Sequence, residues 1–273
     1  MRRAVLLLAI TFSVFGQTTF TCMSPDDVAK HVIKKVAPDY PLLAQETRIT
    51  GTVFLEIGIG ESGTASVLRV MSGHPLLVPA AVNAVRKWKY RPFELDGKLA
   101  MVNSIVTVTF GDNSSDQTPE VRAHILFLMG QLCMAQKKYD EAERYYEEGL
   151  KLWQDHDKDA PEAAESLANL ANLYTQEKKY DLARDYATRS IAICQKNFKK
   201  AGSGNTALRL AYGHPIAYQS WMLSRLALQQ NDTVEAGKQC RTVLDFQAFL
   251  TLTDRNSFVA ACQQIISTPA PKN

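Results

Sequence analysis

One hexapeptide occurs twice in this chain of 273 residues, and it constrains the fold more than any other feature. Lys-Lys-Tyr-Asp-Glu-Ala at residues 137–142 returns as Lys-Lys-Tyr-Asp-Leu-Ala at residues 178–183, forty-one positions later (137 to 178). Near-identity at such a spacing is typical of repeat architectures, in which each unit buries its apolar face against the next. The sequence therefore predicts an array of stacked units in this part of the chain.

The residues around both copies have a helical period and indicate a helix-turn-helix unit. Small residues suit the close approach of two antiparallel helices, and they occur as Gly130 and Ala171 before the turn and as Ala142 and Ala183 after it. This pattern resembles the tetratricopeptide repeat, whose usual period is about 34 residues. The additional length resembles the longer repeats of kinesin light chains.

The array is expected to continue beyond the two clear copies. We predict a third, degraded copy around residues 223–243 and a closing helix at residues 246–266, because a terminal repeat needs a cover for its outer face. Residues 197–215 are interrupted by glycines and are expected to form a loop or a lengthened helix end.

The resemblance implies that the first helices of successive repeats line a concave peptide-binding surface. Asparagines at Asn169 and Asn172, one helical turn apart, suit the backbone of an extended peptide because an amide both donates and accepts hydrogen bonds. The alternative is that they are merely solvated. The residues expected on this surface are Phe127, Gln131, Met134, Asn169, Asn172 and Gln176.

A different period governs the segment before the array. Apolar and polar residues alternate at residues 52–59, 65–71 and 102–110, which predicts three strands whose side chains point alternately to opposite faces. Residues 77–88 have helical spacing and carry prolines near the start, where a helix tolerates them. The predicted order is strand, strand, helix, strand.

Three short motifs give this segment a family resemblance. Pro38-Asp39-Tyr40-Pro41, Gly51-Thr52-Val53 and the run from Arg86 to Pro92 after a hairpin resemble the C-terminal domain of TonB. In that family the domain is periplasmic and receives an extended peptide of an outer-membrane receptor as an added strand at a sheet edge. The resemblance implies a binding edge along residues 102–110, with Val102, Ser104, Val106, Thr107, Val108 and Phe110 as its residues.

The N-terminus has the layout of a secretory signal. Arg2 and Arg3 precede an apolar run at residues 4–15 that is shorter than the roughly twenty residues of a membrane-spanning helix. Cleavage after residue 16 is therefore expected, with residue 22 as the outer limit. Because no charge occurs between Arg3 and Asp26, an uncleaved inner-membrane anchor through Phe20 is the alternative. We expect a periplasmic or otherwise secreted protein that contacts a membrane only if this segment is retained.

Charge and cysteine content exclude other classes. Lysine and arginine number 31 against 28 acidic residues, and removal of Arg2 and Arg3 leaves 29 (31 − 2) against 28. Without a dense basic cluster, a nearly neutral chain is not expected to bind nucleic acid. Five scattered cysteines without a CxxC pair favour small hydrophobic residues on helix faces over a metal site. A bond between Cys240 and Cys262 is the alternative in an oxidising compartment.

Catalytic motifs are missing from the sequence. The five histidines are far apart, and neither HExxH nor GxSxG occurs. Gly58, Gly60 and Gly63 spell GxGxxG, but a predicted strand follows them instead of the helix that a dinucleotide site requires. We therefore expect no enzymatic activity, no cofactor and no metal.

Together these observations predict an α+β chain. A ββαβ domain (30–111) follows the signal peptide (1–16), and a linker (112–119) joins it to an all-α array with its closing helix (120–267) and a tail (268–273). The expected function is a scaffold or adaptor in the bacterial envelope that binds proteins or extended peptide segments, such as those of an outer-membrane receptor or envelope complex. The alternative is an atypical TonB-type energy transducer that supports outer-membrane transport.

Overall fold

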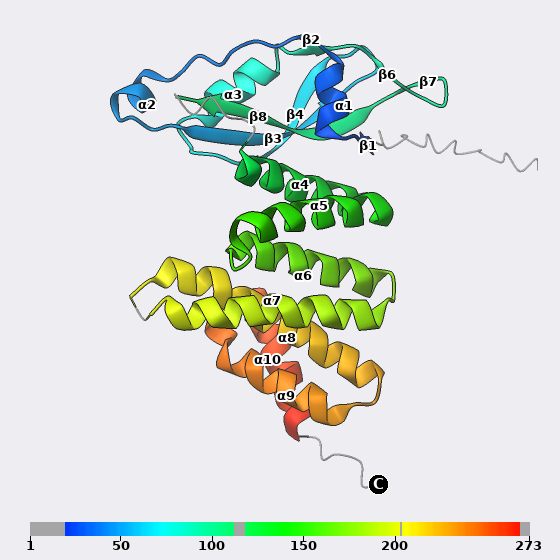
Figure 1. The fold of residues 1–273 in the computed structure, drawn as a ribbon, viewed down its shortest axis with the longest axis vertical. Helices are drawn as coiled ribbons and strands as arrows, with labels where there is room; N and C mark the ends of the chain where they lie inside the picture. The colour runs from blue at the N-terminus through cyan, green and yellow to red at the C-terminus, as the bar shows by residue number, and fades with distance from the viewer. Residues whose placement is uncertain (1–19, 112–117, 203, 268–273) are drawn as a thin grey trace, which may run out of the picture.

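The architecture is α+β, with a mixed sheet and short helices in the N-terminal part and stacked helical pairs after it (Figure 1). This computed structural model describes residues 20–111, 118–202 and 204–267. The predicted signal peptide, the tail and linker residues 112–117 lie outside the described residues. Within the described ranges, no helix is long and apolar enough to cross a membrane.

The predicted strands are three of the strands of a four-stranded sheet in the described part of the chain. They are β3 (Gly51–Ile59), β4 (Ala65–Ser72) and β8 (Val102–Phe110), and a short strand β1 (Thr21–Cys22) gives the order β1-β8-β3-β4. β8 pairs antiparallel with the whole of β3. On its other side, β1 pairs in parallel with only the first two residues of β8. The remainder of that side is therefore a sheet edge.

Shorter elements surround the sheet. The predicted helix is α3 (Val78–Val85), and it ends before Trp88 because the chain turns there into β5 (Lys89–Tyr90). No sequence pattern predicted the elements before residue 51 or the hairpin around Asp96 and Gly97. These are α1 (Pro25–Lys30), β2 (Val32–Lys34), which pairs with β5, α2 (Leu42–Glu46), and the hairpin strands β6 (Phe93–Leu95) and β7 (Lys98–Ala100).

The two central strands of the sheet, β3 and β8, are buried on both faces, whereas β4 is largely exposed. On one face Val53, Leu55 and Val108 belong to a core that includes residues of α3. On the opposite face Phe54 and Ile105 belong to the core of the helical array. The sheet and the array therefore share a continuous apolar interface, because neighbouring residues of a strand point to opposite faces.

The array consists of three helical pairs and a closing helix (Figure 1). Apolar residues of the first two pairs form a single core, to which α8 also contributes Met222, Leu223 and Leu226. The pairs are α4 (Pro119–Ala135) with α5 (Tyr139–Asp157), α6 (Pro161–Gln176) with α7 (Tyr180–Lys200), and α8 (Thr206–Gln229) with α9 (Thr233–Asp245); the 3-10 turn η1 (Gln247–Phe249) and α10 (Leu252–Ser267) follow.

The repeated hexapeptide contains the turn inside each of the first two helical pairs, and the third pair has the same turn with a different sequence. Lys137, Lys178 and the equivalent Asn231 of the third pair have φ angles of 59°, 61° and 59°. The N–H of the residue after each of them donates to a carbonyl of the preceding helix at 2.8–2.9 Å. This left-handed residue ends the first helix and reverses the chain, which explains why the turn recurs.

The expected close helix contacts are present. A Cβ atom at Gly130 would lie 2.4 Å from the ring of Tyr146, and Ala142 and Ala183 are fully buried. In the second pair, Ser190 Oγ donates to the carbonyl of Ala164 at 2.7 Å. Small side chains at these positions let the two helices of a pair approach each other.

The segment at residues 197–215 is mostly helical, so of the two expected forms, a loop or a lengthened helix end, the structure has the helical one and only a short connection. α7 extends to Lys200, and α8 begins at Thr206 and contains Pro215. Asn205 caps the start of α8 because its Oδ1 accepts the N–H of Leu208 at 3.1 Å. The glycine-containing connection is thus confined to residues 201–205.

Candidate functional site

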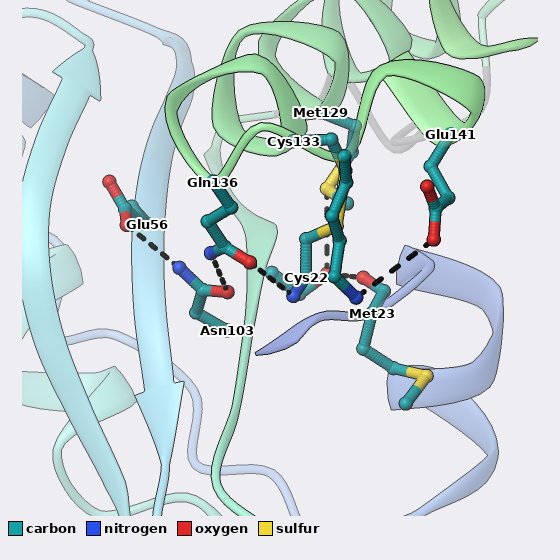
Figure 2. Close-up of a disulfide and its surroundings, with 10 residues drawn as sticks. Cys22, Met23, Glu56, Asn103, Met129, Cys133, Gln136 and Glu141 are labelled. Carbon is teal, nitrogen blue, oxygen red and sulfur yellow. Dashed lines mark hydrogen bonds and ion pairs between the residues drawn. A yellow bond between two sulfur atoms is a disulfide. The ribbon is translucent and has the colours of Figure 1, made fainter. Parts of the chain in front are cut away.

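A disulfide joins the sheet to the array. Cys22 of β1 is bonded to Cys133 of α4, with Cα atoms 5.8 Å apart (Figure 2). A second bond joins Cys240 of α9 to Cys262 of α10, with Cα atoms 5.0 Å apart. Four of the five cysteines are therefore cross-linked, which corrects the expectation that they are unbonded hydrophobic residues. Burial raises the pKa of the remaining thiol, Cys194, to about 12. In the described parts of the chain, no cluster of His, Cys, Asp or Glu could hold a metal ion.

A row of hydrogen bonds runs beside this disulfide (Figure 2). Gln136, which follows the last residue of α4, accepts the N–H of Cys22 through Oε1 at 2.9 Å and donates from Nε2 to Asn103 Oδ1 at 2.9 Å. Asn103 donates in turn to Glu56 Oε1 at 3.1 Å, and Glu56 forms an ion pair with Arg69 at 3.0 Å. Because buried polar groups are costly unless paired, this row fixes the position of α4 against the sheet.

Aromatic rings extend the contact between sheet and array. The ring of His124 on α4 lies edge-on to Phe54 with centroids 4.6 Å apart, and it stacks on Phe127 at 6.0 Å. Burial lowers the pKa of His124, although the carboxylate of Glu162 acts in the opposite direction. The neutral imidazole thus packs as part of the interface.

The direction of the β8 peptide groups follows from its pairing with the N-terminal strand. The N–H of Thr21 donates to the carbonyl of Met101 at 3.0 Å, and that of Met23 donates to Asn103 at 2.9 Å. Odd-numbered residues therefore direct their peptide groups away from β3, since peptide groups alternate along a strand. By this alternation the peptide N–H and C=O groups of Ile105 and Thr107 point outward, to the side of β8 away from β3. We call this stretch, residues 105–107, the open edge.

The predicted edge residues differ in their access to this side. Val102 is paired with Thr21, and Ser104 is buried with its Oγ donating to the carbonyl of Met23 at 2.8 Å. In the described part of the chain, no strand pairs with this side of β8 beyond Asn103. Val106, Val108 and Phe110 direct their peptide groups toward β3, with which they are paired. Thr107 is the predicted residue that carries an outward peptide group. Ile105, whose peptide group also points outward, was not among the predicted edge residues. The pairing with β1 shows which peptide groups point outward, and the sequence did not predict β1.

Three hollows border the open edge, and Thr107 lines all of them. A small hollow of about 140 Å³ is lined also by Val28 and Tyr90. The second, of about 350 Å³, lies beside Val36 and Pro38. The largest, of about 650 Å³, extends to Arg122 and Tyr145 of the array. The open edge is therefore bordered by hollows of the first domain, and the largest of them opens toward the first helical pair.

One buried polar atom in this region lacks a partner. The side chain of Tyr90 is 2% exposed and lines the smallest hollow. Its hydroxyl has no hydrogen-bond partner among the described residues, and burial raises its pKa. A ligand with a polar group in that hollow would pair this hydroxyl.

The structure divides the six residues predicted for the concave face of the array. Phe127 is buried in the core against His124 and Tyr146, which corrects its assignment to an accessible surface. Met134 is half-buried against the same core, Gln131 is half-buried and Gln176 is exposed. Asn169 and Asn172 come together in a groove of about 380 Å³ between α6 and α8. The prediction missed the residues of α8 that form the second wall, because it expected an irregular segment there.

Comparisons with known proteins agree with these two parts. Residues 36–111 match the family described as Gram-negative bacterial TonB protein C-terminal, and residues 121–196 match the tetratricopeptide repeat. Protein tonB2 of Pseudomonas aeruginosa is 41% identical over 58 residues, which are 20% of this chain and 22% of that protein. Protein TonB of Vibrio cholerae is 35% identical over 68 residues, which are 24% of this chain and 28% of that protein.

A solved structure of BtubC (BKLC) from P. vanneervenii matches with a TM-score of 0.42 and 16% identity, covering 57% of this chain and 70% of that one. The matches to the two TonB proteins span less than a third of their lengths. The chain thus combines a TonB C-terminal domain with tetratricopeptide repeats, as its sequence motifs predicted. Domains of both kinds typically bind proteins and are not catalytic.

Proposed function

We propose that this chain is a non-enzymatic scaffold or adaptor of the bacterial envelope that captures an extended segment of a partner protein as an added strand at the open edge. The outward peptide group of Thr107, in the part of β8 that no described strand pairs with on that side, is the observation that carries the proposal. Such an edge offers backbone donors and acceptors to an incoming strand.

The surroundings of the edge support strand addition. The hollows beside Thr107 provide room for the alternate side chains of a docked strand. Tyr90 adds a hydroxyl that is buried without a partner among the described residues. Lys35 borders all three hollows and is itself exposed. A partner strand would therefore lie between Lys35 and β8.

The array supports the role of a scaffold because it is held rigidly against the sheet. The disulfide and the hydrogen bonds of Gln136 bridge the two parts. The sheet edge and the groove between α6 and α8 therefore keep a fixed relative position, so that two segments of one partner, or two partners, would be held together.

The two disulfides support an extracytoplasmic location, because such bonds persist in oxidising compartments. The matched TonB domain points to the periplasm. If a signal peptide is removed, the cut must leave Cys22 in the mature chain, since this residue forms the bond to Cys133. Retention of the N-terminal segment would instead place the protein at the inner membrane.

Site-specific photo-cross-linking in the producing bacterium tests the proposal. A photoreactive amino acid at the exposed position of Lys35 should form an adduct with a protein, whose cross-linked peptide mass spectrometry identifies. The same amino acid at Lys98, an exposed position of β7 away from the open edge, serves as the control.

The role of the backbone is tested in the same background. Thr107→Pro removes the outward amide and should abolish the adduct, whereas Thr107→Ala should keep it. A folded Thr107→Pro protein that still forms the Lys35 adduct at the original yield would overturn strand addition.

The resemblance to TonB proteins favours one second function, an atypical energy transducer for outer-membrane transport. The two functions differ at the N-terminus, because coupling to an inner-membrane motor requires a retained anchor. Intact mass of the protein purified from its host separates them: loss of the first residues excludes the transducer, whereas a full-length membrane-bound chain supports it.

A further inference from the structure

The groove between α6 and α8 is a second candidate binding site. Asn169 and Asn172 come from α6, and His214, Tyr218 and Gln219 come from α8. The second wall lies beyond residues 121–196, the part that matches the tetratricopeptide family. The residues of this wall therefore lie outside the matched repeats.

Gln219 gives the groove an unsatisfied acceptor. The residue lines the groove and is only 2% exposed, yet its Oε1 has no hydrogen-bond partner among the described residues. A buried polar atom without a partner costs about 1–3 kcal/mol. A ligand that donates a hydrogen bond to this side chain would remove that cost.

A proline in α8 leaves a second acceptor. Pro215 lies inside the helix and has no N–H, so the carbonyl of Ala211, four residues earlier, lacks its usual helical donor. Both Ala211 and Pro215 line the groove. The carbonyl of Ala211 therefore adds an acceptor to the same groove, about two helical turns from Gln219.

The charge of the groove is negative. Glu165 lines it with a solvent-exposed side chain, and partial desolvation of its carboxyl together with the carboxylate of Glu162 raises its pKa. A cation in the groove would relieve both effects. The rings of His214 and Tyr218, stacked 6.0 Å apart, add an aromatic surface of the kind on which cations bind.

We infer that this groove binds a lysine side chain of an extended peptide. An ammonium group carries three donors and no acceptor, which suits a groove whose lining offers it acceptors: the carboxylate of Glu165, the carbonyl of Ala211 and the amide oxygen of Gln219. The amides of Asn169 and Asn172 then face the peptide backbone. This inference rests on the proposed role of the array as a second peptide surface, and it is independent of strand addition at Thr107.

Titration of the whole mature protein with three pentapeptides tests the inference. The probes have blocked ends and carry lysine, norleucine or glutamate at the centre of four alanines, and NMR of the His214 imidazole reports binding. Only the lysine peptide should give saturable shifts. Equal binding of the norleucine peptide, or no saturable binding of the lysine peptide at about millimolar concentration, would overturn the inference.

Two variants locate the contact. Glu165→Gln should weaken binding of the lysine peptide about tenfold or more, whereas Gln195→Ala, an exposed change on α7 outside the groove lining, should not alter it. Gln219→Met should also weaken binding but raise the melting temperature of the free protein, because it removes an unsatisfied buried atom. Unchanged affinity in both Glu165→Gln and Gln219→Met would contradict the assignment.

A third variant separates this site from the open edge. Thr107→Pro should keep full affinity for the lysine peptide. If the lysine peptide fails to bind while the Lys35 adduct still forms, the groove inference is wrong and strand addition stands. If the lysine peptide binds but no Lys35 adduct forms, the groove inference stands and strand addition is wrong.

Discussion

Cys22 and Cys133 are joined by a disulfide across 111 residues of sequence, and the bond connects the first strand of the sheet to the first helix of the array. The two parts that the sequence separates are thereby one structural unit in the described chain. Phe54 and Ile105 of the sheet lie in the same core as Leu126 and Met129 of α4. The bond therefore reinforces an interface that apolar packing already forms.

Removal of this disulfide should destabilise the whole protein. We expect Cys22→Ala with Cys133→Ala to lower the free energy of unfolding in urea by about 2–4 kcal/mol, because the bond restricts the unfolded chain. Cys194→Ala keeps both bonds and is the control, with a smaller loss. Equal stability of the double variant and the wild type would show that packing alone holds the interface.

The side chain of Gln136 should contribute to the stability of the interface between sheet and array, because it hydrogen-bonds to both Cys22 and Asn103. Gln136→Leu leaves the N–H of Cys22 and Oδ1 of Asn103 without this partner, which should cost about 1–3 kcal/mol in urea unfolding. Gln131→Leu, on the same helix and half-buried, is the matched control and should cost less. Similar losses for both variants would argue against the hydrogen-bond row as a determinant of the interface.

Patterns local in sequence predicted most of the elements. The alternation of apolar residues gave β3, β4 and β8, and the repeated hexapeptide gave the turns before α5 and α7. The interface was not predictable in this way. Cys22, Asn103 and Gln136 meet only after the chain has folded, and no local period marks them.

The candidate sites show the same limit. Asn169 and Asn172 were found because they lie on one face of a helix that the repeat predicts. Gln219 was missed because α8 contains Pro215, and proline in a sequence argues against a helix. Phe127 was assigned to an accessible face, but its ring is covered by His124 of α4 and Tyr146 of α5. His124 in turn packs on Phe54 of the sheet, a contact that the sequence does not show.

The helix contact at Gly130 predicts opposite outcomes for two glycine substitutions. Gly130→Ala places a methyl group 2.4 Å from the ring of Tyr146 and should cost about 1–3 kcal/mol. At Gly237 in α9 a Cβ atom meets nothing within 4 Å, so Gly237→Ala should stabilise the array by about 0.5–1 kcal/mol. Urea unfolding followed by helical circular dichroism measures both. A stabilising Gly130→Ala would refute the close contact.

His124 predicts a dependence of stability on pH. Its pKa is lower in the folded protein because burial disfavours the charged ring. The unfolded chain therefore binds more protons below its own pKa of about 6.5, and the folded state loses stability as the pH falls through that range. His124→Phe keeps a ring beside Phe54 but cannot titrate. The fall in unfolding free energy from about pH 7.5 to about pH 5 should be smaller in this variant, and an identical fall would contradict the assignment.

Two neighbouring prolines test the direction of the peptide groups in β8 without any partner. The N–H of Val108 points to β3, so Val108→Pro removes a ladder hydrogen bond at the centre of the sheet and should prevent folding of the first domain. The N–H of Thr107 points to the open edge, so Thr107→Pro should fold with a moderate loss of melting temperature. Thr107→Ala controls for the side chain and should remain close to the wild type. Circular dichroism and thermal unfolding of the three variants decide the point: if Thr107→Pro is unfolded and Val108→Pro is folded, the parity is reversed, and strand addition would have to use the amides of Val106 and Val108 instead.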